Sequence, residues 1–318
     1  MNTSEGKKRV FFERAIFISW YCAKGDCKFC YMSTQKDKIA DPGRARRSTP
    51  SILAEAILAK KLNWKIEFIS GGIHSFSKKE LVSLLNHVYN IYGEKLWLNL
   101  GVLDEDLIRQ LLPITEGICS TVECINPVVH DQVCPSKPLS EVLEQFRICD
   151  RYNLKKSITI IIGLGESEDD IPLLIDFIRD HGISKMTFYA LNPIRGTIFK
   201  KGPDKDYFLR WIKETRAACP DLHIVAGHWV DRVDYIREMI IAGADSITKY
   251  PAFRLFGSSH SKELERNIGS DFASNLTEMP DFDVDKELKK YGFEDRLNSQ
   301  VKGKIERYLE VMRKGERK

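Results

Sequence analysis

Three cysteines near the N-terminus have the spacing of a metal-binding loop. Cys22, Cys27 and Cys30 are arranged as C-x4-C-x2-C, directly after a short apolar run. Three thiolates cannot complete a four-ligand structural zinc site, whereas a [4Fe-4S] cluster held by three cysteines keeps one iron open for a substrate. The spacing therefore favours a reactive iron–sulfur cluster. The alternatives are a zinc site completed by a distant His or Cys, and a thiol trio without metal.

A second group of thiols lies in the middle of the chain. Cys119, Cys124 and Cys134 are spaced C-x4-C-x9-C on and after a strand expected at 118–123. They suggest a second, auxiliary [4Fe-4S] cluster; the alternative is that Cys119 is a buried core thiol and the others are incidental. Side chains alternate along a strand, so Cys119 and Cys124 can converge only if the strand ends or bulges near Glu123.

Eight short apolar runs, each a candidate strand, alternate with longer amphipathic stretches. The expected strands are Ala15–Ser19, Ile66–Ser70, Leu96–Leu100, Ile118–Glu123, Ile158–Gly163, Met186–Leu191, His223–Ala226 and Asp245–Thr248. This alternation predicts parallel βα units, and eight units close a (βα)8 TIM-type barrel whose active site lies at the C-terminal ends of the strands. A doubly wound open sheet is the alternative. We expect the barrel to span residues 1–268, followed by a charged helical C-terminal extension over 269–318.

Composition limits the function classes. The 318 residues are 43% hydrophobic, and 49 basic residues nearly balance 45 acidic ones. This balance does not indicate nucleic-acid binding. No apolar run approaches the roughly 20 residues of a membrane span, and residues 1–8 are polar, without a signal-peptide core. We therefore expect a cytoplasmic protein with no membrane partner, in which clustered cysteines bind metal.

The first cysteine group, taken together with several other residues, resembles the radical S-adenosylmethionine (SAM) superfamily. Phe29 matches the family's adenine-packing position, and Gly71-Gly72 is similar to its glycine pair beside the methionine amino group. Glu123 is similar to the acidic residue that holds the methionine amine or the ribose. Gly163 and Gly165 resemble its fifth-strand motif, which supports the adenine. One departure is the cysteine spacing, since the usual family pattern is C-x3-C-x2-C.

The resemblance covers about residues 14–250 and implies reductive cleavage of SAM at the cluster of Cys22, Cys27 and Cys30. Among the branches, the chain looks most like biotin-synthase-like proteins and most resembles a component of the two-protein, archaeal-type lipoyl synthase. That likeness implies sulfur insertion at an unactivated carbon of an octanoyl or mercaptooctanoyl group, with the auxiliary cluster as sulfur donor. The implied partners are an acyl-lysyl carrier protein (lipoyl domain or H protein), a second radical SAM protein and an electron donor such as ferredoxin.

Three questions stay open at this stage. The auxiliary cluster needs a fourth ligand, for which the candidates are His223, Arg254, Ser258, Ser259 and His260. The basic run 36–47 is compatible with an acidic carrier but is also typical of a solvated face. Biotin synthesis, hydrogenase cofactor maturation and a methylornithine-type mutase are alternative functions; maturation and the mutase need only the first cluster to generate a radical.

Overall fold

The strands of the protein close into a barrel. The computed structural model describes residues 9–72, 76–227, 230–279, 281 and 283–316. Its strands are all parallel and follow one another around the barrel in chain order. They are β1 (Phe11–Phe17), β2 (Lys65–Ser70), β3 (Leu96–Asn99), β4 (Thr115–Glu123), β5 (Lys155–Ile162), β6 (Lys185–Ala190), β7 (His223–Gly227) and β8 (Ser246–Thr248). The predicted (βα)8 barrel is confirmed.

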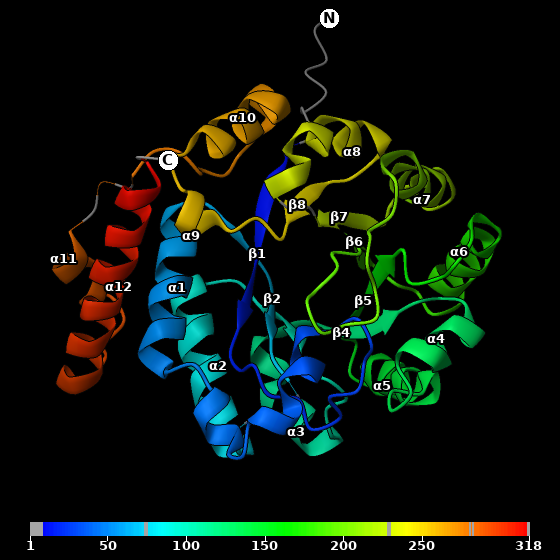
Figure 1. Ribbon diagram of the computed structural model, residues 1–318. Helices are drawn as coiled ribbons and strands as arrows, with labels where there is room; N and C mark the ends of the chain where they lie inside the picture. The colour runs from blue at the N-terminus through cyan, green and yellow to red at the C-terminus, as the bar shows by residue number, and fades with distance from the viewer. Residues whose placement is uncertain (1–8, 73–75, 228–229, 280, 282, 317–318) are drawn as a thin grey trace, which may run out of the picture.

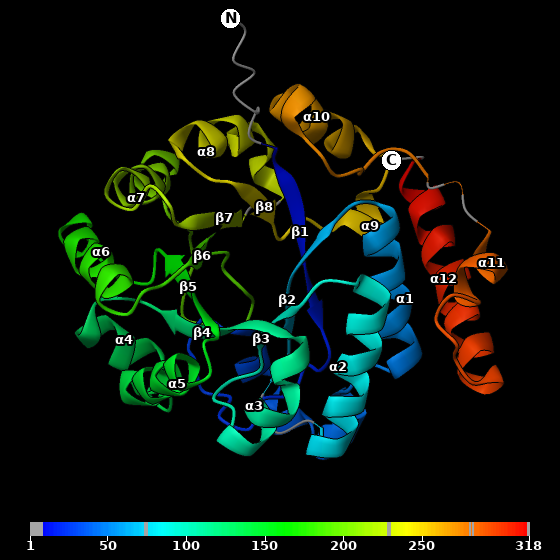
Figure 2. The same cartoon turned by 180° about the vertical axis from the view of Figure 1, so that it is seen from behind.

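Helices surround this ring of strands (Figures 1 and 2). The first eight are α1 (Thr49–Lys61), α2 (Lys78–Tyr92), α3 (Glu105–Leu111), α4 (Pro127–Val133), α5 (Leu139–Arg151), α6 (Ile171–Asp180), α7 (Lys205–Ala218) and α8 (Ile236–Ala242). The last four are α9 (Ala252–Leu255), α10 (Ser259–Ile268), α11 (Val284–Leu288) and α12 (Asp295–Gly315). The apolar core lies between the strands and the surrounding helices, because the helices of the ring bury apolar side chains against the strands.

The inside of the barrel, in contrast, is partly polar. The carboxylate of Glu13 on β1 accepts from Lys185 Nζ at 2.5 Å and lies 2.6 Å from His223 Nε2. Burial alone would raise the pKa of Glu13, but its contacts with Lys185 and His223 lower it well below its usual value. Glu13, Lys185 and His223 therefore form a polar cluster inside the barrel, near the first residues of β6 and β7.

Strand β1 differs most from its expected bounds. It begins at Phe11 rather than Ala15, because Phe11 and Phe12 pair with Ser246 and Ile247 of β8. This pairing closes the barrel, and it depends on residues far apart in the sequence. The alternating residues of β1 also include Glu13 and Arg14, which hide the strand from a search for apolar runs.

The C-terminal extension is helical, as expected, and it packs on the barrel. Helix α12 lies against α1 and α9, outside the ring, and α11 lies beside it (Figures 1 and 2). Val301, Ile305 and Met312 of α12 are fully buried in the main core. At the end of the helix, Gly315 comes so close to α9 that a Cβ there would lie 2.6 Å from Phe256 O. The extension is therefore a packed element of the molecule.

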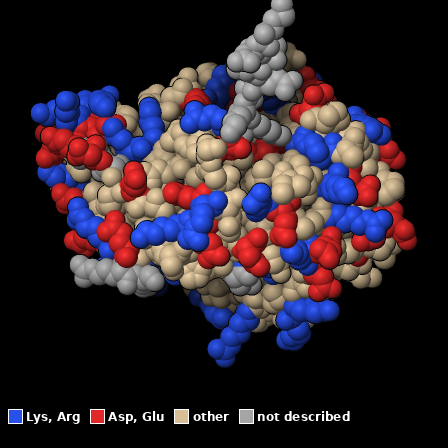
Figure 3. Space-filling view, turned by 90° about the horizontal axis from the view of Figure 1, so that it is seen from above, with Lys and Arg blue, Asp and Glu red and all other residues tan. Residues whose placement is uncertain are grey.

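Charges on the surface are mixed. On the face over α8 and α10, acidic and basic side chains alternate, and neither sign covers a continuous area of the described residues (Figure 3). Within the described part of the chain, no helix combines the length and the apolar character that a membrane span requires.

Candidate functional site

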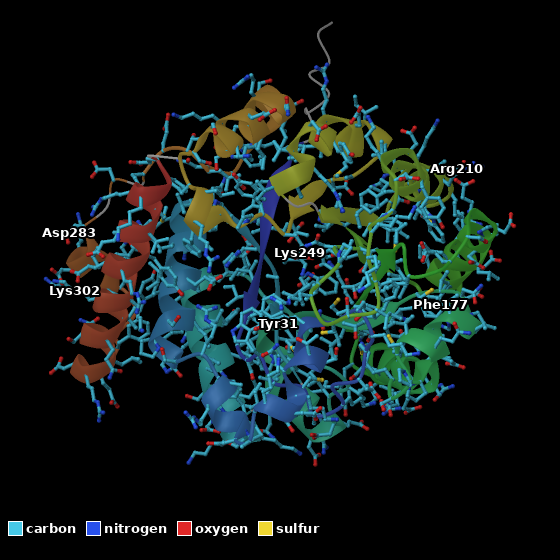
Figure 4. The ribbon with its side chains drawn as sticks, in the orientation of Figure 1. Tyr31, Phe177, Arg210, Lys249, Asp283 and Lys302 are labelled. Carbon is cyan, nitrogen blue, oxygen red and sulfur yellow. The ribbon has the colours of Figure 1, made fainter. Side chains whose placement is uncertain are left out.

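A cavity opens at the end of the barrel where the strands finish. Its volume is about 1090 Å³, and its walls come from the loops after several strands and from α9 and α12. Figure 4 shows Tyr31 and Lys249, which both line it, near the centre of the molecule, whereas Arg210 and Lys302 lie at the periphery. The C-terminal ends of barrel strands are where enzymes of this architecture place their chemistry.

Cys22, Cys27 and Cys30 all line this cavity, on the loop that follows β1. The extra residue between the first two is absorbed by a tight turn at Gly25, whose φ is 50° and whose Cβ would lie 2.8 Å from Cys22 O. The backbone N–H of Cys30 donates to Cys27 O at 3.1 Å, which closes the second turn of the loop. Burial raises the pKa of the Cys30 thiol to about 11. Despite the longer first gap between the cysteines, all three thiols thus line the same cavity.

Gly71-Gly72, at the end of β2, lines the cavity beside this loop. A Cβ on Gly72 would lie 1.4 Å from Tyr21 O and 2.7 Å from Cys22 Cα. Because no larger residue fits, glycine here allows the cysteine loop to lie directly against the end of β2. The close backbone approach at Gly72 is therefore made by the protein's own cysteine loop.

Glu123 ends β4 and points into the same cavity. The pairing of β4 with β5 shifts between Ser120 and Glu123, and Glu123 has a φ of 66°, so the strand bulges near Glu123. Its carboxylate accepts from Lys137 Nζ at 3.1 Å and from Thr159 Oγ1 at 3.3 Å. Burial alone would lower the pKa of Lys137, but Glu123 and the nearby thiols raise it above its usual value. Lys137, which sequence reasoning missed, thus orients this carboxylate.

Phe29 also lines the cavity and packs in a small apolar cluster with Leu164. Gly163 and Gly165 lie outside the cavity lining, behind this cluster. Their backbone N–H groups, with that of Leu164, donate to the folded-back carboxylate of Glu166 at 2.5–3.1 Å. The Glu166 carboxylate therefore occupies the amides of the glycine turn, which leaves none of them free for a ligand. The turn supports Phe29 through Leu164.

The structure separates the three cysteines of the second group. The Cys134 thiol donates a hydrogen bond to Cys27, which lowers the pKa of Cys27 and raises that of Cys134. Cys124 packs in the same apolar cluster. Cys119 instead faces the barrel interior, where Ser157 donates to its sulfur and burial raises its pKa to about 12. Two of these thiols thus lie behind the first cysteine loop, and the third is a barrel residue.

The five candidates for a fourth ligand are also divided. Arg254 lines the cavity. His223 is the first residue of β7; its ring is bonded to Glu13, and it lies outside the cavity lining. Ser258 is the buried N-cap of α10, and Ser259 and His260 are exposed in the first turn of that helix.

Much of the basic run 36–47 is used within the molecule. Arg47 lies 2.6 Å from the buried Glu55, and Arg46 lies 3.1 Å from Glu80. Lys36 donates to a backbone carbonyl of the cysteine loop at 2.7 Å. These contacts fix the loop to α1 and α2, so they compete with any role of the run in binding a partner.

Lys249 is a second lining residue that the search for motifs did not find. It follows β8 directly, and burial lowers its pKa below the usual value. A polar residue just past an expected strand was the available signal, because strand ends form the site in a βα barrel. The outer wall adds Lys304, Arg307, Tyr308 and Val311, all from α12. No motif in the extension marks them.

The donor set fits an iron–sulfur cluster and a nucleoside ligand. Among the described residues, no three His, Cys, Asp or Glu side chains converge closely enough to hold a single metal ion. The three thiols of the first loop instead spread over one wall of an open cavity, which also contains an aromatic ring, a glycine backbone and a carboxylate. Three cysteines and adjacent free space are what a [4Fe-4S] cluster with an accessible iron needs.

Comparisons with known proteins agree with this geometry. The family model described as the Radical SAM superfamily matches residues 18–178. The uncharacterized protein MJ0597 of Methanocaldococcus jannaschii is 39% identical over 287 residues, which cover 89% of this chain and 79% of that protein. A biotin synthase of Thermodesulfovibrio yellowstonii is 25% identical, over 82% of this chain and 84% of that protein.

A solved structure supports the architecture. The FeFe-hydrogenase maturase HydG from Carboxydothermus hydrogenoformans superposes with a TM-score of 0.66, over 97% of this chain and 81% of that chain. The two sequences are 14% identical, so this likeness concerns the fold alone.

Proposed function

Since the chain belongs to the Radical SAM superfamily, we propose that it removes a hydrogen atom from an unactivated carbon of an acyl chain and inserts sulfur there. The acyl chain we propose is an octanoyl or mercaptooctanoyl group on a lysine of a carrier protein. The proposed radical chemistry rests on one observation, the shared cavity. All three thiols of the first loop line it together with Phe29, Gly71-Gly72 and Glu123.

Each of these residues has a defined task. When bound, the cluster and SAM supply the one-electron chemistry that yields a hydrogen-abstracting radical. Cys22, Cys27 and Cys30 would hold the cluster, and Glu123, held in place by Lys137, would take the amine or a ribose hydroxyl of SAM. Phe29 would pack against the adenine. The apolar walls exclude water, which would otherwise quench a reactive intermediate.

The sulfur-inserting part rests on the second group of thiols. Cys124 and Cys134 lie together behind the cysteine loop, and we propose that with Cys119 they bind an auxiliary [4Fe-4S] cluster. Binding would require β4 to shift, because Cys119 now faces the barrel interior. A second radical SAM protein and a ferredoxin-type electron donor complete the proposed system.

Iron content tests this part of the proposal. Anaerobically reconstituted protein is expected to bind about eight irons, and the triple variant Cys119→Ala/Cys124→Ala/Cys134→Ala about four. The triple variant should still cleave SAM but should add no sulfur to an octanoyl-lysine or mercaptooctanoyl-lysine peptide, read by mass. About four irons in the unaltered protein would contradict sulfur insertion from an auxiliary cluster.

A second candidate is a radical enzyme with one cluster, as in a mutase or a maturation enzyme. It is favoured by the position of the second group of thiols, since Cys119, Cys124 and Cys134 all lie outside the cavity lining. It predicts about four irons, SAM cleavage and no transfer of sulfur, so the same experiment separates the two.

A further inference from the structure

Lys249 has a backbone conformation that lysine rarely adopts. Four non-glycine residues of the described chain have positive φ: Asn63, Asn153, Glu123 and Lys249. Asparagine tolerates this region, but long side chains are uncommon there, and such outliers cluster at functional sites. Lys249 has a φ of 69°, and both it and Glu123 line the cavity. The protein thus holds two charged residues in unfavourable conformations at the same mouth.

The amine of Lys249 is enclosed by rings and has no anionic partner. Its Nζ lies 4.9 Å from the ring centre of Tyr189 and 5.8 Å from that of Phe17. Within the described residues, it takes part in no hydrogen bond or ion pair. Aromatic faces stabilise a cation only in part, so a cation held here keeps most of its capacity to bind an anion.

The nearest carboxylates are already engaged. Glu67, inside the barrel, accepts hydrogen bonds of 2.6–3.0 Å from three hydroxyls, those of Thr187, Tyr189 and Thr248. Glu123 is bonded to Lys137, and Arg14, a cation that acts on Lys249, is bonded to Glu55 at 2.7 Å. The Cys30 thiol, whose pKa burial raises, also faces Lys249. Rotation of these groups toward Lys249 would break existing bonds.

The rest of this wall is also basic. Arg254 of α9 and Lys304 and Arg307 of α12 line the same cavity, and no ion pair of these three exists within the described part of the chain. A neutral ligand that filled the cavity would remove water from Lys249 without supplying an anion in its place, which is costly for a charged group. A ligand with an anionic group at Lys249 would avoid that cost.

We propose that Lys249 is a substrate-binding residue and that the substrate places an anionic group against its amine, beside the cysteine loop. This inference rests on the proposed function in one respect, that the cavity binds the substrate. It adds that the bound substrate carries a negative charge. Under sulfur insertion, the anion is the thiolate of a mercaptooctanoyl chain. Under the second candidate, it is the carboxylate of a small acid.

Equilibrium binding to the anaerobically reconstituted protein, with SAM present, tests this inference. One arm compares octanoate with octanamide, and the other compares a mercaptooctanoyl-lysine peptide with an octanoyl-lysine peptide. The first pair differs in a carboxylate. The second differs in a thiol, which is mostly protonated in water near pH 7 and must release its proton to solvent when it binds as a thiolate beside Lys249. The arm in which the carboxylate or thiol probe binds tighter identifies the source of the anion. Because binding is measured without turnover, failure of sulfur transfer leaves the result interpretable.

Variants of Lys249 test whether this residue causes the preference for an anionic probe. Lys249→Met is expected to weaken the favoured anionic probe about tenfold or more and leave its neutral partner within about twofold. Lys249→Arg should recover most of the affinity. Lys302→Met, which removes a peripheral charge paired with Asp285, is the control and should change nothing.

SAM provides the internal check, since its own carboxylate is the other possible anion. Binding of SAM should be the same in the unaltered protein and in Lys249→Met. Two results would overturn the proposal: neutral and anionic probes bound equally well in both arms, or SAM affinity lost together with probe affinity.

Discussion

The carboxylate of Glu123 depends on one cation, Lys137. The two side chains are 10% and 17% exposed, so both are mostly removed from water. Lys137 also donates to Thr121 at 2.7 Å, and it comes from the segment that follows Cys134. A partly buried pair of this kind stabilises little beyond an apolar replacement, but it is costly to break from one side. The pair therefore serves mainly to hold the Glu123 carboxylate in place at the site, and removing one partner alone is what costs stability.

This asymmetry gives a prediction for single residues. Lys137→Met should lower the free energy of unfolding by about 2 kcal/mol, because Glu123 would stay buried with only the Thr159 hydroxyl. The double variant Lys137→Met/Glu123→Gln should be more stable than Lys137→Met alone. Urea denaturation of the cluster-free protein measures both. Strictly additive losses would show that the two side chains do not interact.

At the scale of elements, the hydrophobic pattern predicted all eight strands within a few residues. The pattern is informative because strands of a parallel barrel are buried by helices on one side. It missed the start of β1, where Glu13 and Arg14 interrupt the apolar run, and it missed α4, a short helix that begins at Pro127. The start of β1 depends on its pairing with β8, which is distant in the sequence. Helix α4 instead begins at a local signal, the Asn126 cap followed by Pro127, which a pattern of apolar residues does not contain.

The packing of helix α12 also could not be predicted from a local sequence pattern. Its sequence is charged, and only the helical period of Val301, Ile305 and Met312 indicates that one face is buried. What that face meets could not be derived from the extension itself. The structure makes α12 a wall of the cavity, through Lys304, Arg307 and Tyr308.

Two glycines of α12 give a matched test of this docking. A Cβ on Gly315 would lie 2.6 Å from Phe256 O and 2.9 Å from Arg254 O, whereas one on Gly303 would meet nothing within 4 Å. Gly315→Ala should therefore destabilise the protein by about 1–3 kcal/mol through overpacking. Gly303→Ala should stabilise it by about 0.5–1 kcal/mol, since alanine is the better helix former. Equal effects in thermal melts would mean that α12 does not pack on α9 as described.

At the scale of the whole molecule, the site is assembled from segments that only the closed barrel brings together. The sequence identified Cys22, Cys27 and Cys30, which are close in the chain, and the cavity contains all three. It also placed Gly71-Gly72 and Glu123 on strand ends, as found. It could not show that Cys119 faces the barrel interior or that Cys134 bonds to Cys27, because both facts depend on the exact path of β4 and the segment after it.

The central claim is that the first cysteine loop holds a cluster that cleaves SAM. The most direct measurement is the formation of 5′-deoxyadenosine by the anaerobically reconstituted protein with SAM and dithionite. The unaltered protein and the control Cys219→Ala, a thiol outside the cavity lining, should form it, and Cys22→Ala should not. Equal 5′-deoxyadenosine from Cys22→Ala, or none from the unaltered protein with its iron bound, would contradict the account.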